Sequence, residues 1–188
     1  MEKRRVKLSG DQKRLLLIIS KFSKPATSRD DEEIWIKKIP LMALIIRGID
    51  MNVLKSYDFS PTLVEYIDTM RFANISKEGE DDIADLRKLG LVERLKLATS
   101  HYVYVSAYRI TNDGLKYVKS IEKPHYDAVD RLLKCKKCNG QYNIETRSDA
   151  PYLFCNKCKK TEMVHIFDLE EVSYVTKPTF SEIWLPLE

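Results

Sequence analysis

Four cysteines in two matched pairs constrain this chain more than any other feature of its sequence. Cys135 and Cys138 form one Cys-x2-Cys pair, Cys155 and Cys158 form a second, and sixteen residues separate the pairs. Two residues between cysteines allow a tight turn to direct both sulfurs at one ion. The intervening segment is long enough for a β-hairpin that brings the second pair opposite the first. The spacing therefore predicts a tetrahedral site of four thiolates.

Zinc is the metal that this donor set and spacing favour. Because four protein thiolates leave no coordination position for water or substrate, we expect one structural Zn2+ ion and no catalysis by it. Thioredoxin-like redox chemistry is the other interpretation of a Cys-x2-Cys pair, but the sequence around the cysteines lacks the βαβ pattern of that fold. Disulfides are disfavoured because no secretion signal is recognisable.

The segment from Leu133 to about Val164 resembles zinc ribbons. Such a module is too small to have a core of its own, so the resemblance implies that the ion holds it together. Arg147 to Pro151 is predicted to form the turn of its hairpin. The expected strand residues are Tyr142, Ile144, Tyr152 and Phe154.

Basic residues are concentrated in this segment, where residues 131–160 carry eight Lys or Arg and two Asp or Glu. Such a surface, with aromatic residues nearby, can hold nucleic acid through phosphate contacts and stacking. The alternative is that the lysines balance the net negative charge of zinc bound to four thiolates. The candidate contact residues for nucleic acid or a protein partner are Lys134, Lys136, Lys137, Lys157, Lys159, Tyr142 and, near the C-terminus, Trp184.

The residues before the cysteines favour a mainly helical region. An apolar face from Leu15 to Phe22 predicts a first helix, capped by Ser9 or Asp11 and ending near Ser23. The almost uniformly apolar stretch 34–48 predicts a buried second element that ends at Gly48.

Further along, Ser60 and Pro61 are typical of a helix N-cap and first helical residue, so residues 60–70 are predicted to form a helix. Ser76 is expected to cap another helix, ending at Gly90. Alternating apolar residues then predict a hairpin across 92–110, and residues 111–114 are expected to begin a last helix that reaches residue 121.

Residues 60–121 resemble winged-helix proteins of the MarR and PadR kind. The resemblance lies in DDIADLRKLGLVERL, followed by the hairpin and YRITNDGLKYV. It implies that the helix from Glu78 to Leu89 enters a major groove where the fold binds DNA. Residues 76–88, however, carry five acidic and three basic side chains, which favours protein docking over contact with phosphates. A generic α+β domain that ends in a hairpin is the other interpretation.

The sequence thus predicts an α+β protein, a mainly helical winged-helix domain plus a small β zinc ribbon. We expect the winged-helix-like domain with its N-terminal helical extension at residues 9–123 and the ribbon at 131–166. An acidic and apolar C-terminal segment follows at 167–188, with five acidic residues and one lysine. Its large apolar residues indicate that it packs on the chain itself or docks on a partner.

Sequence motifs give no support to an enzyme. The three histidines, His101, His125 and His165, stand outside any catalytic or metal-binding motif, and the chain has no P-loop or dinucleotide-binding glycine pattern. No apolar run approaches the ~18 residues that span a bilayer. We therefore expect an intracellular protein, in the cytoplasm or nucleus, with no membrane association.

The order of winged helix and zinc ribbon resembles the alpha subunit of general transcription factor E from archaea and eukaryotes. That resemblance implies a non-enzymatic, zinc-binding adaptor that docks on protein subunits of a large assembly, most simply the transcription machinery. A DNA-binding transcriptional regulator that uses the wing and the basic ribbon is one alternative. A structural subunit of another complex, such as a cytoskeletal or ciliary assembly, is another. The formal net charge of only +4 argues against a uniform polyanion-binding coat.

Overall fold

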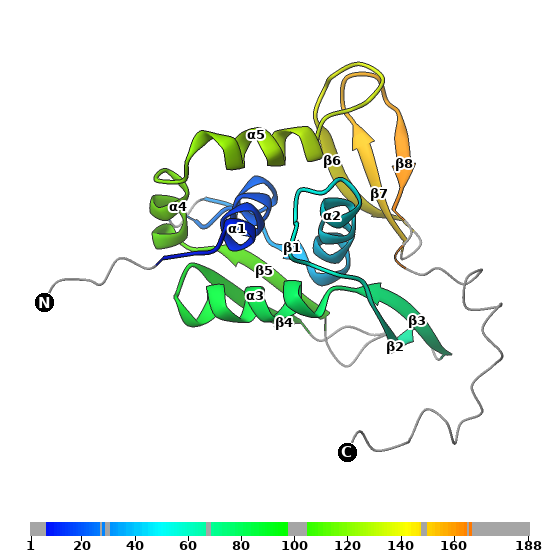
Figure 1. The fold of residues 1–188 in the computed structure, drawn as a ribbon, viewed down its shortest axis with the longest axis horizontal. Coiled ribbons are helices and arrows are strands. Elements are labelled where there is room, and N and C mark those ends of the chain that lie inside the picture. Colours follow the sequence, from blue (N-terminus) through cyan, green and yellow to red (C-terminus); the bar gives the residue numbers. More distant parts are fainter. Residues whose placement is uncertain are drawn as a thin grey trace, which may run out of the picture.

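The protein is an α+β structure with five helices and three antiparallel sheets among the residues described (Figure 1). The computed structural model describes residues 7–26, 28, 31–66, 69–97, 105–147, 150–164 and 166. Within these ranges no helix is long and apolar enough to cross a membrane. The predicted fold class is confirmed as mixed α+β.

Two helices form the centre of the core. Helix α1 (Gly10–Phe22) begins at Ser9, whose hydroxyl accepts a hydrogen bond from the Gln12 N–H, as predicted. Helix α2 (Lys38–Asp50) follows the short strand β1 (Ile36–Lys37) and is almost entirely buried. The predicted end at Gly48 is wrong by two residues, because the helix continues to Asp50.

The predicted helix, hairpin and helix that follow Ser76 are confirmed. Helix α3 (Lys77–Lys88) is capped by the Ser76 hydroxyl and followed by Gly90 at φ 71°, which favours glycine. Strands β4 (Val92–Leu97) and β5 (Val105–Ile110) pair, and β1 completes the sheet in the order β1-β5-β4. Helix α4 (Asn112–Val118) starts at the Thr111 cap, although it ends three residues before the predicted Ile121.

The helix predicted for residues 60–70 is wrong. Strands β2 (Ser60–Tyr66) and β3 (Thr69–Ile75) form a two-stranded antiparallel hairpin instead, with Ser60 opposite Ile75. The β-branched and aromatic residues of this segment favour an extended backbone over a helix. Pro61 is compatible with the first residues of a strand that has only one neighbour, because such a strand has an unpaired edge.

Residues between the two predicted domains, 9–123 and 131–166, form a helix that the sequence patterns did not predict. Helix α5 (Lys123–Leu132) begins with Pro124 in its first turn, where a proline is tolerated because no N–H is needed there. Its apolar residues Ala128, Val129 and Leu132 are buried, and α5 contacts α1. The chain therefore reaches the first cysteine from a fixed helix.

The cysteine-bearing segment forms a three-stranded sheet in the order β6-β7-β8. Strands β6 (Tyr142–Arg147) and β7 (Ala150–Cys155) form the predicted hairpin, and β8 (Thr161–Met163) pairs with β7. The predicted turn is shorter than expected, since the strands include Arg147 and Pro151, and residues 148–149 lie outside the described ranges.

A single hydrophobic core joins this sheet to the helices. Leu132, Leu133, Tyr142 and Leu153 belong to the same buried cluster as the residues of α1 and α2. The division into segments 9–123, 131–166 and 167–188 stays a prediction, and residues 167–188 lie outside the described ranges.

The buried carboxylate of Asp11 ties the start of α1 to the loop after α2. It accepts hydrogen bonds from the backbone N–H groups of Lys55 (3.2 Å) and Ser56 (2.9 Å), and from the Ser56 hydroxyl. Burial opposes ionisation of Asp11, but these hydrogen bonds and the charge of Arg14 outweigh it and lower its pKa. Asp11 is only 6% exposed, so its loss removes a buried acceptor that several donors share.

Replacing Asp11 with asparagine is expected to reduce the free energy of unfolding by about 2 kcal/mol at pH 7, because an amide places N–H against N–H. A lowered pKa means that the carboxylate stabilises the fold above its unfolded pKa and stops doing so as pH falls through the folded value. Urea unfolding of both proteins at pH 7 and at pH 3 therefore measures a difference that shrinks at low pH. Asp130→Asn, at an exposed residue, is the matched control. An equal difference at both pH values contradicts this role of Asp11.

Candidate metal centre

Two turns of the same shape present the four cysteines. In each, the N–H four residues after the first cysteine donates to that cysteine's carbonyl: Asn139 to Cys135 and Lys159 to Cys155, both at 2.9 Å. Asn139 and Lys159 have φ of 57° and 58°, so both turns close with a left-handed residue. The equal spacing of the two pairs in the sequence is thus repeated in the backbone.

The four sulfur atoms all lie within 4.8 Å of one another. The closest pairs are Cys138 with Cys155 at 3.4 Å and Cys135 with Cys158 at 3.6 Å. Sulfurs placed ~2.3 Å from one tetrahedral zinc ion are about 3.8 Å apart, whereas disulfide sulfurs are about 2.05 Å apart. The four cysteines are free thiols placed where they can hold one metal ion, which agrees with the predicted ligand set.

Electrostatics in the cluster also fit a cation. Burial opposes ionisation of Cys135, but hydrogen bonds from the Tyr142 hydroxyl and from the Lys137 and Cys138 N–H groups lower its pKa to about 6. At Cys138 the Gly140 N–H favours the thiolate, yet burial and the neighbouring sulfurs raise the pKa to about 11. One thiol thus ionises readily and another resists, because adjacent negative charges repel. A bound divalent metal removes that repulsion.

Arg47 connects the metal centre to the helical core. Its side chain is buried in α2, and its Nε donates to the Leu132 carbonyl (3.0 Å) while Nη1 donates to Glu162 (2.9 Å). The Tyr142 hydroxyl, whose single proton Cys135 and Glu162 share, lies 3.2 Å from the other oxygen of Glu162, and the Arg47 guanidinium lies 5.5 Å from the Tyr142 ring. Burial opposes ionisation of Glu162, but Arg47 outweighs it and lowers its pKa. The same tyrosine therefore supports Cys135 and the arginine.

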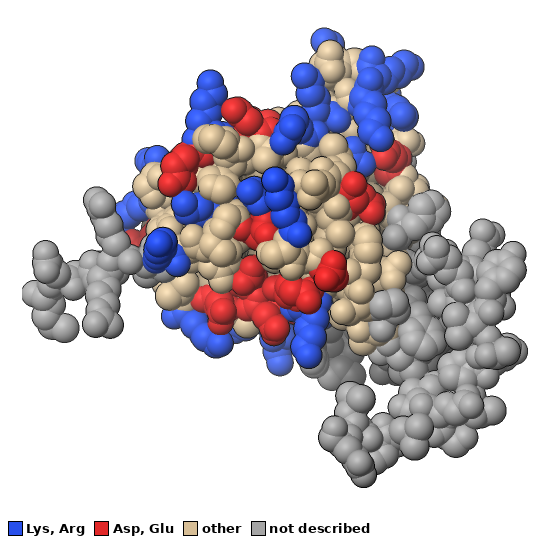
Figure 2. Space-filling view, viewed as in Figure 1, with Lys and Arg blue, Asp and Glu red and all other residues tan. Residues whose placement is uncertain are grey.

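The lysines predicted as contact residues lie on the surface of this segment. Figure 2 shows Lys and Arg side chains gathered over β6–β8, away from a group of acidic side chains over α3. Lys159 lies over the Phe154 ring at 5.4 Å. The exposed lysines are Lys134, Lys136, Lys137, Lys157 and Lys159, with Lys160 beside them.

Other predicted site residues are placed differently. The Tyr142 side chain is completely buried, so its ring is not a surface on which a base can stack, and this part of the expectation is corrected. Trp184, His101 and His165 lie outside the described residues. His125 is half-buried on α5, 3.7 Å from Glu122.

Sequence reasoning missed Arg47 and Glu162. The place of Arg47 inside the apolar stretch 34–48 could have indicated such a pair, because a buried cation requires a polar partner. Its partner, 115 residues further along the chain, cannot be identified from local patterns.

Gly140 is packed against the cysteines, and Gly140→Ala is expected to weaken metal binding by about tenfold or more. A Cβ at this position meets the Cys155 sulfur at 3.1 Å and the Cys138 sulfur at 3.2 Å, closer than ordinary contacts. Competition with a chromophoric chelator measures the change in affinity. The same change at Gly10, where the nearest atom is 3.5 Å away, is the control. Equal affinities for wild type and Gly140→Ala contradict this packing argument.

Comparison with known proteins gives a family but no activity. A search of curated proteins finds no match to this chain. The sequence model of the uncharacterized protein MJ1567 family matches residues 11–166. This range includes helices α2 to α5, nearly all of α1, and the four cysteines. The chain belongs to the uncharacterized protein MJ1567 family.

Proposed function

We propose that this protein is a non-enzymatic, zinc-stabilised adaptor that docks on a large macromolecular assembly. Its support is the separation of charge on one continuous body, with exposed lysines on β6–β8 and acidic side chains on α3 (Figure 2). Opposed surfaces of this kind favour two different contacts over one polyanion-binding face. The resemblance to winged-helix and zinc-ribbon factors favours the transcription machinery as the assembly.

Zinc is the metal we propose for the cysteine cluster. Tetrahedral sites with four thiolates hold zinc or iron. Two short Cys-x2-Cys turns, closed by a compact sheet, are typical of structural zinc sites. Such a site is coordinatively saturated, so its contribution is folding energy and not catalysis. The proposal that the protein is not an enzyme rests on this closed donor set and on the absence of catalytic motifs in the sequence.

The acidic surface is proposed as the protein-docking side. Asp81 is exposed on α3, and Asp82 on the same helix is held by Tyr57 (2.6 Å) and by Gln12 (2.8 Å). The helix is therefore fixed to the body. Asp81 is its exposed carboxylate, while the partly buried Glu80 and Asp85 pair with Lys38 and Lys88. The acidic N-terminal part of α3 attracts a basic protein surface, while the last turn carries Arg87 and Lys88.

A DNA-binding regulator is the second candidate function. It is favoured by one observation: the exposed side chains of Lys134, Lys157 and Lys160 make no hydrogen bond or ion pair with any described residue. Unpaired lysines on one surface are the usual means of holding phosphates.

Purified protein is expected to contain one zinc ion per chain, measured by elemental analysis. Removal of the ion by a chelator is expected to lower Tm by about 10 °C or more, because a structural zinc site supplies several kcal/mol of folding energy. Readdition of zinc restores Tm. Cys138→Ser reproduces the loss without chelator, and Ser120 replaced by Ala is the control. One iron per chain, or no metal and an unchanged Tm, contradicts the proposal.

Charge reversal on the two surfaces separates protein docking from DNA binding. If α3 docks on protein, Asp81→Lys reduces recovery of the partner from native extract about tenfold, while Asp127→Lys on α5 does not. Recovery is scored by mass spectrometry for polymerase subunits, other assemblies and nucleic acid.

Nuclease treatment leaves the recovered proteins unchanged under the docking proposal. Loss of the recovered proteins after nuclease treatment contradicts the docking proposal. The DNA-binding candidate replaces it if, in addition, Lys157→Glu weakens binding to duplex DNA about tenfold while Lys123→Glu does not.

A further inference from the structure

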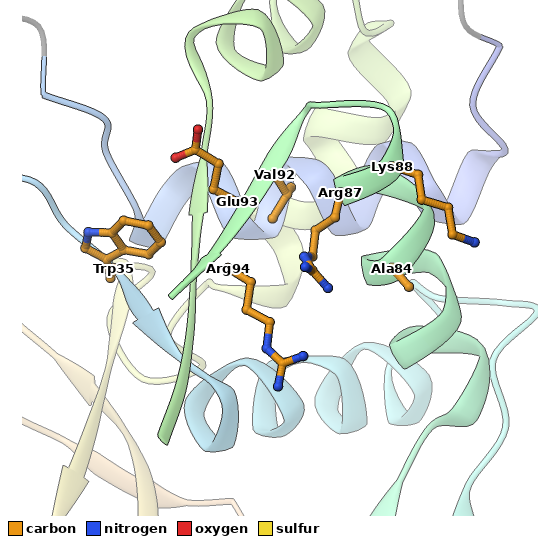
Figure 3. A pocket seen from close by; sticks show the side chains of 7 residues that line it. All are labelled: Trp35, Ala84, Arg87, Lys88, Val92, Glu93 and Arg94. Carbon is orange, nitrogen blue, oxygen red and sulfur yellow. The ribbon is translucent and has the colours of Figure 1, made fainter. Parts of the chain in front are cut away.

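A hollow of about 500 Å3 lies between the C-terminal end of α3 and strand β4. None of the residues that line it belongs to the metal centre. Figure 3 shows the side chains that line it: Trp35, Ala84, Arg87, Lys88, Val92, Glu93 and Arg94. Its volume is within the ~300–1,000 Å3 range of small-molecule sites. It combines an indole ring with three basic side chains.

The ring of Trp35 is held in place from two directions. Its Nε1 donates a hydrogen bond to Glu33 (3.1 Å), and the Arg109 guanidinium lies 4.4 Å from its centroid. Arg109 is itself held by Glu33 and by Glu93 (2.6 Å). The positive charge of Arg109 and the negative charge of Glu93 are thus used to fix the ring, which lines the hollow as a rigid planar wall.

Two arginines in the hollow have unused donors. Arg94 is fixed by its Nε (3.1 Å) and Nη2 (2.8 Å), both of which donate to the Ser106 hydroxyl, and its Nη1 makes no hydrogen bond with any described residue. Arg87 makes no hydrogen bond or ion pair with any described residue. Figure 3 shows both arginines extending into the same space, whereas Lys88 points away and pairs with Asp85 (2.9 Å).

We infer that this hollow binds a nucleoside phosphate, either free or as part of a single strand of nucleic acid. The base stacks against Trp35, and the phosphate is held between Arg87 and Arg94. Stacking on an aromatic ring requires an unpaired base, so duplex DNA does not satisfy the site. An acidic peptide uses the two arginines but leaves the indole ring without a planar partner. The inference uses neither the metal nor the ribbon lysines. The hollow lies at the basic C-terminal end of α3, whereas the docking proposal uses Asp81 nearer the N-terminal end, so the two can fail separately.

Tryptophan fluorescence tests stacking directly. The chain has two tryptophans, so the Trp184→Phe protein, with zinc bound, reports on Trp35 alone. We expect AMP or an adenine oligonucleotide to quench this emission at saturation. Quenching by AMP identifies a free nucleotide site, and quenching by the oligonucleotide alone identifies a single-stranded site; both support the inference. Inorganic phosphate is expected to compete without quenching.

Variants distinguish the hollow from general attraction of anions. Arg87→Gln removes an exposed side chain without a partner, and it is expected to weaken binding of a labelled oligonucleotide, followed by anisotropy, about tenfold. It should also reduce the slope of log affinity against log salt by about 0.7. Trp35→Leu is expected to weaken binding about fivefold or more. Lys123→Gln on α5 is the control with an equal change of charge, and circular dichroism checks that each variant is folded.

Three results overturn the inference. The first is the absence of quenching by both AMP and the oligonucleotide. The second is binding that Arg87→Gln and Lys123→Gln weaken equally, which indicates general attraction of anions. The third is an acidic peptide, such as hexaglutamate, that binds more tightly than the oligonucleotide and loses affinity in Arg87→Gln; that result assigns the hollow to a protein partner.

Discussion

The ribbon brings four sulfur atoms within 4.8 Å of one another, so its structure depends on how the repulsion among their thiolates is relieved. Cys135 ionises readily, whereas the pKa of Cys138 is raised to about 11 by burial and by the neighbouring sulfurs. Without a cation, the backbone holds together groups that cannot all become thiolates. A divalent ion would remove that repulsion, and we propose that metal binding and formation of the two turns are coupled.

The ribbon is in turn part of the core of the whole protein. Arg47 in α2 binds the end of α5 through the Leu132 carbonyl and binds β8 through Glu162. Tyr142 contacts both Glu162 and Cys135, so a short chain of contacts joins the sulfurs to the most buried helix. This rigid connection holds the basic ribbon surface and the acidic face of α3 apart in a fixed orientation. The hollow beside Trp35 adds a third charged surface on the same body.

Local patterns predicted the elements whose signals lie close together in the sequence. The cysteine pairs, the Ser9, Ser76 and Thr111 caps and the strands on either side of the hairpin were of this kind. The helix predicted at residues 60–70 was wrong because a Ser-Pro pair is compatible with both a helix start and the first residues of an edge strand. Helix α5 was not predicted, because it lies between the two expected domains and its Pro124 is compatible with both a helix start and an irregular segment. The Arg47–Glu162 pair and the arrangement of Trp35 with Arg87 and Arg94 arise only from tertiary packing.

We propose that four cysteine thiolates hold one zinc ion that orders the ribbon. X-ray absorption spectroscopy at the zinc edge of the purified protein tests it most directly, because the spectrum reports both the ligand atoms and their distances. We expect four sulfur neighbours at about 2.3 Å and no nitrogen or oxygen neighbour bound to the zinc. A first shell that contains nitrogen or oxygen, or a protein without zinc, contradicts it.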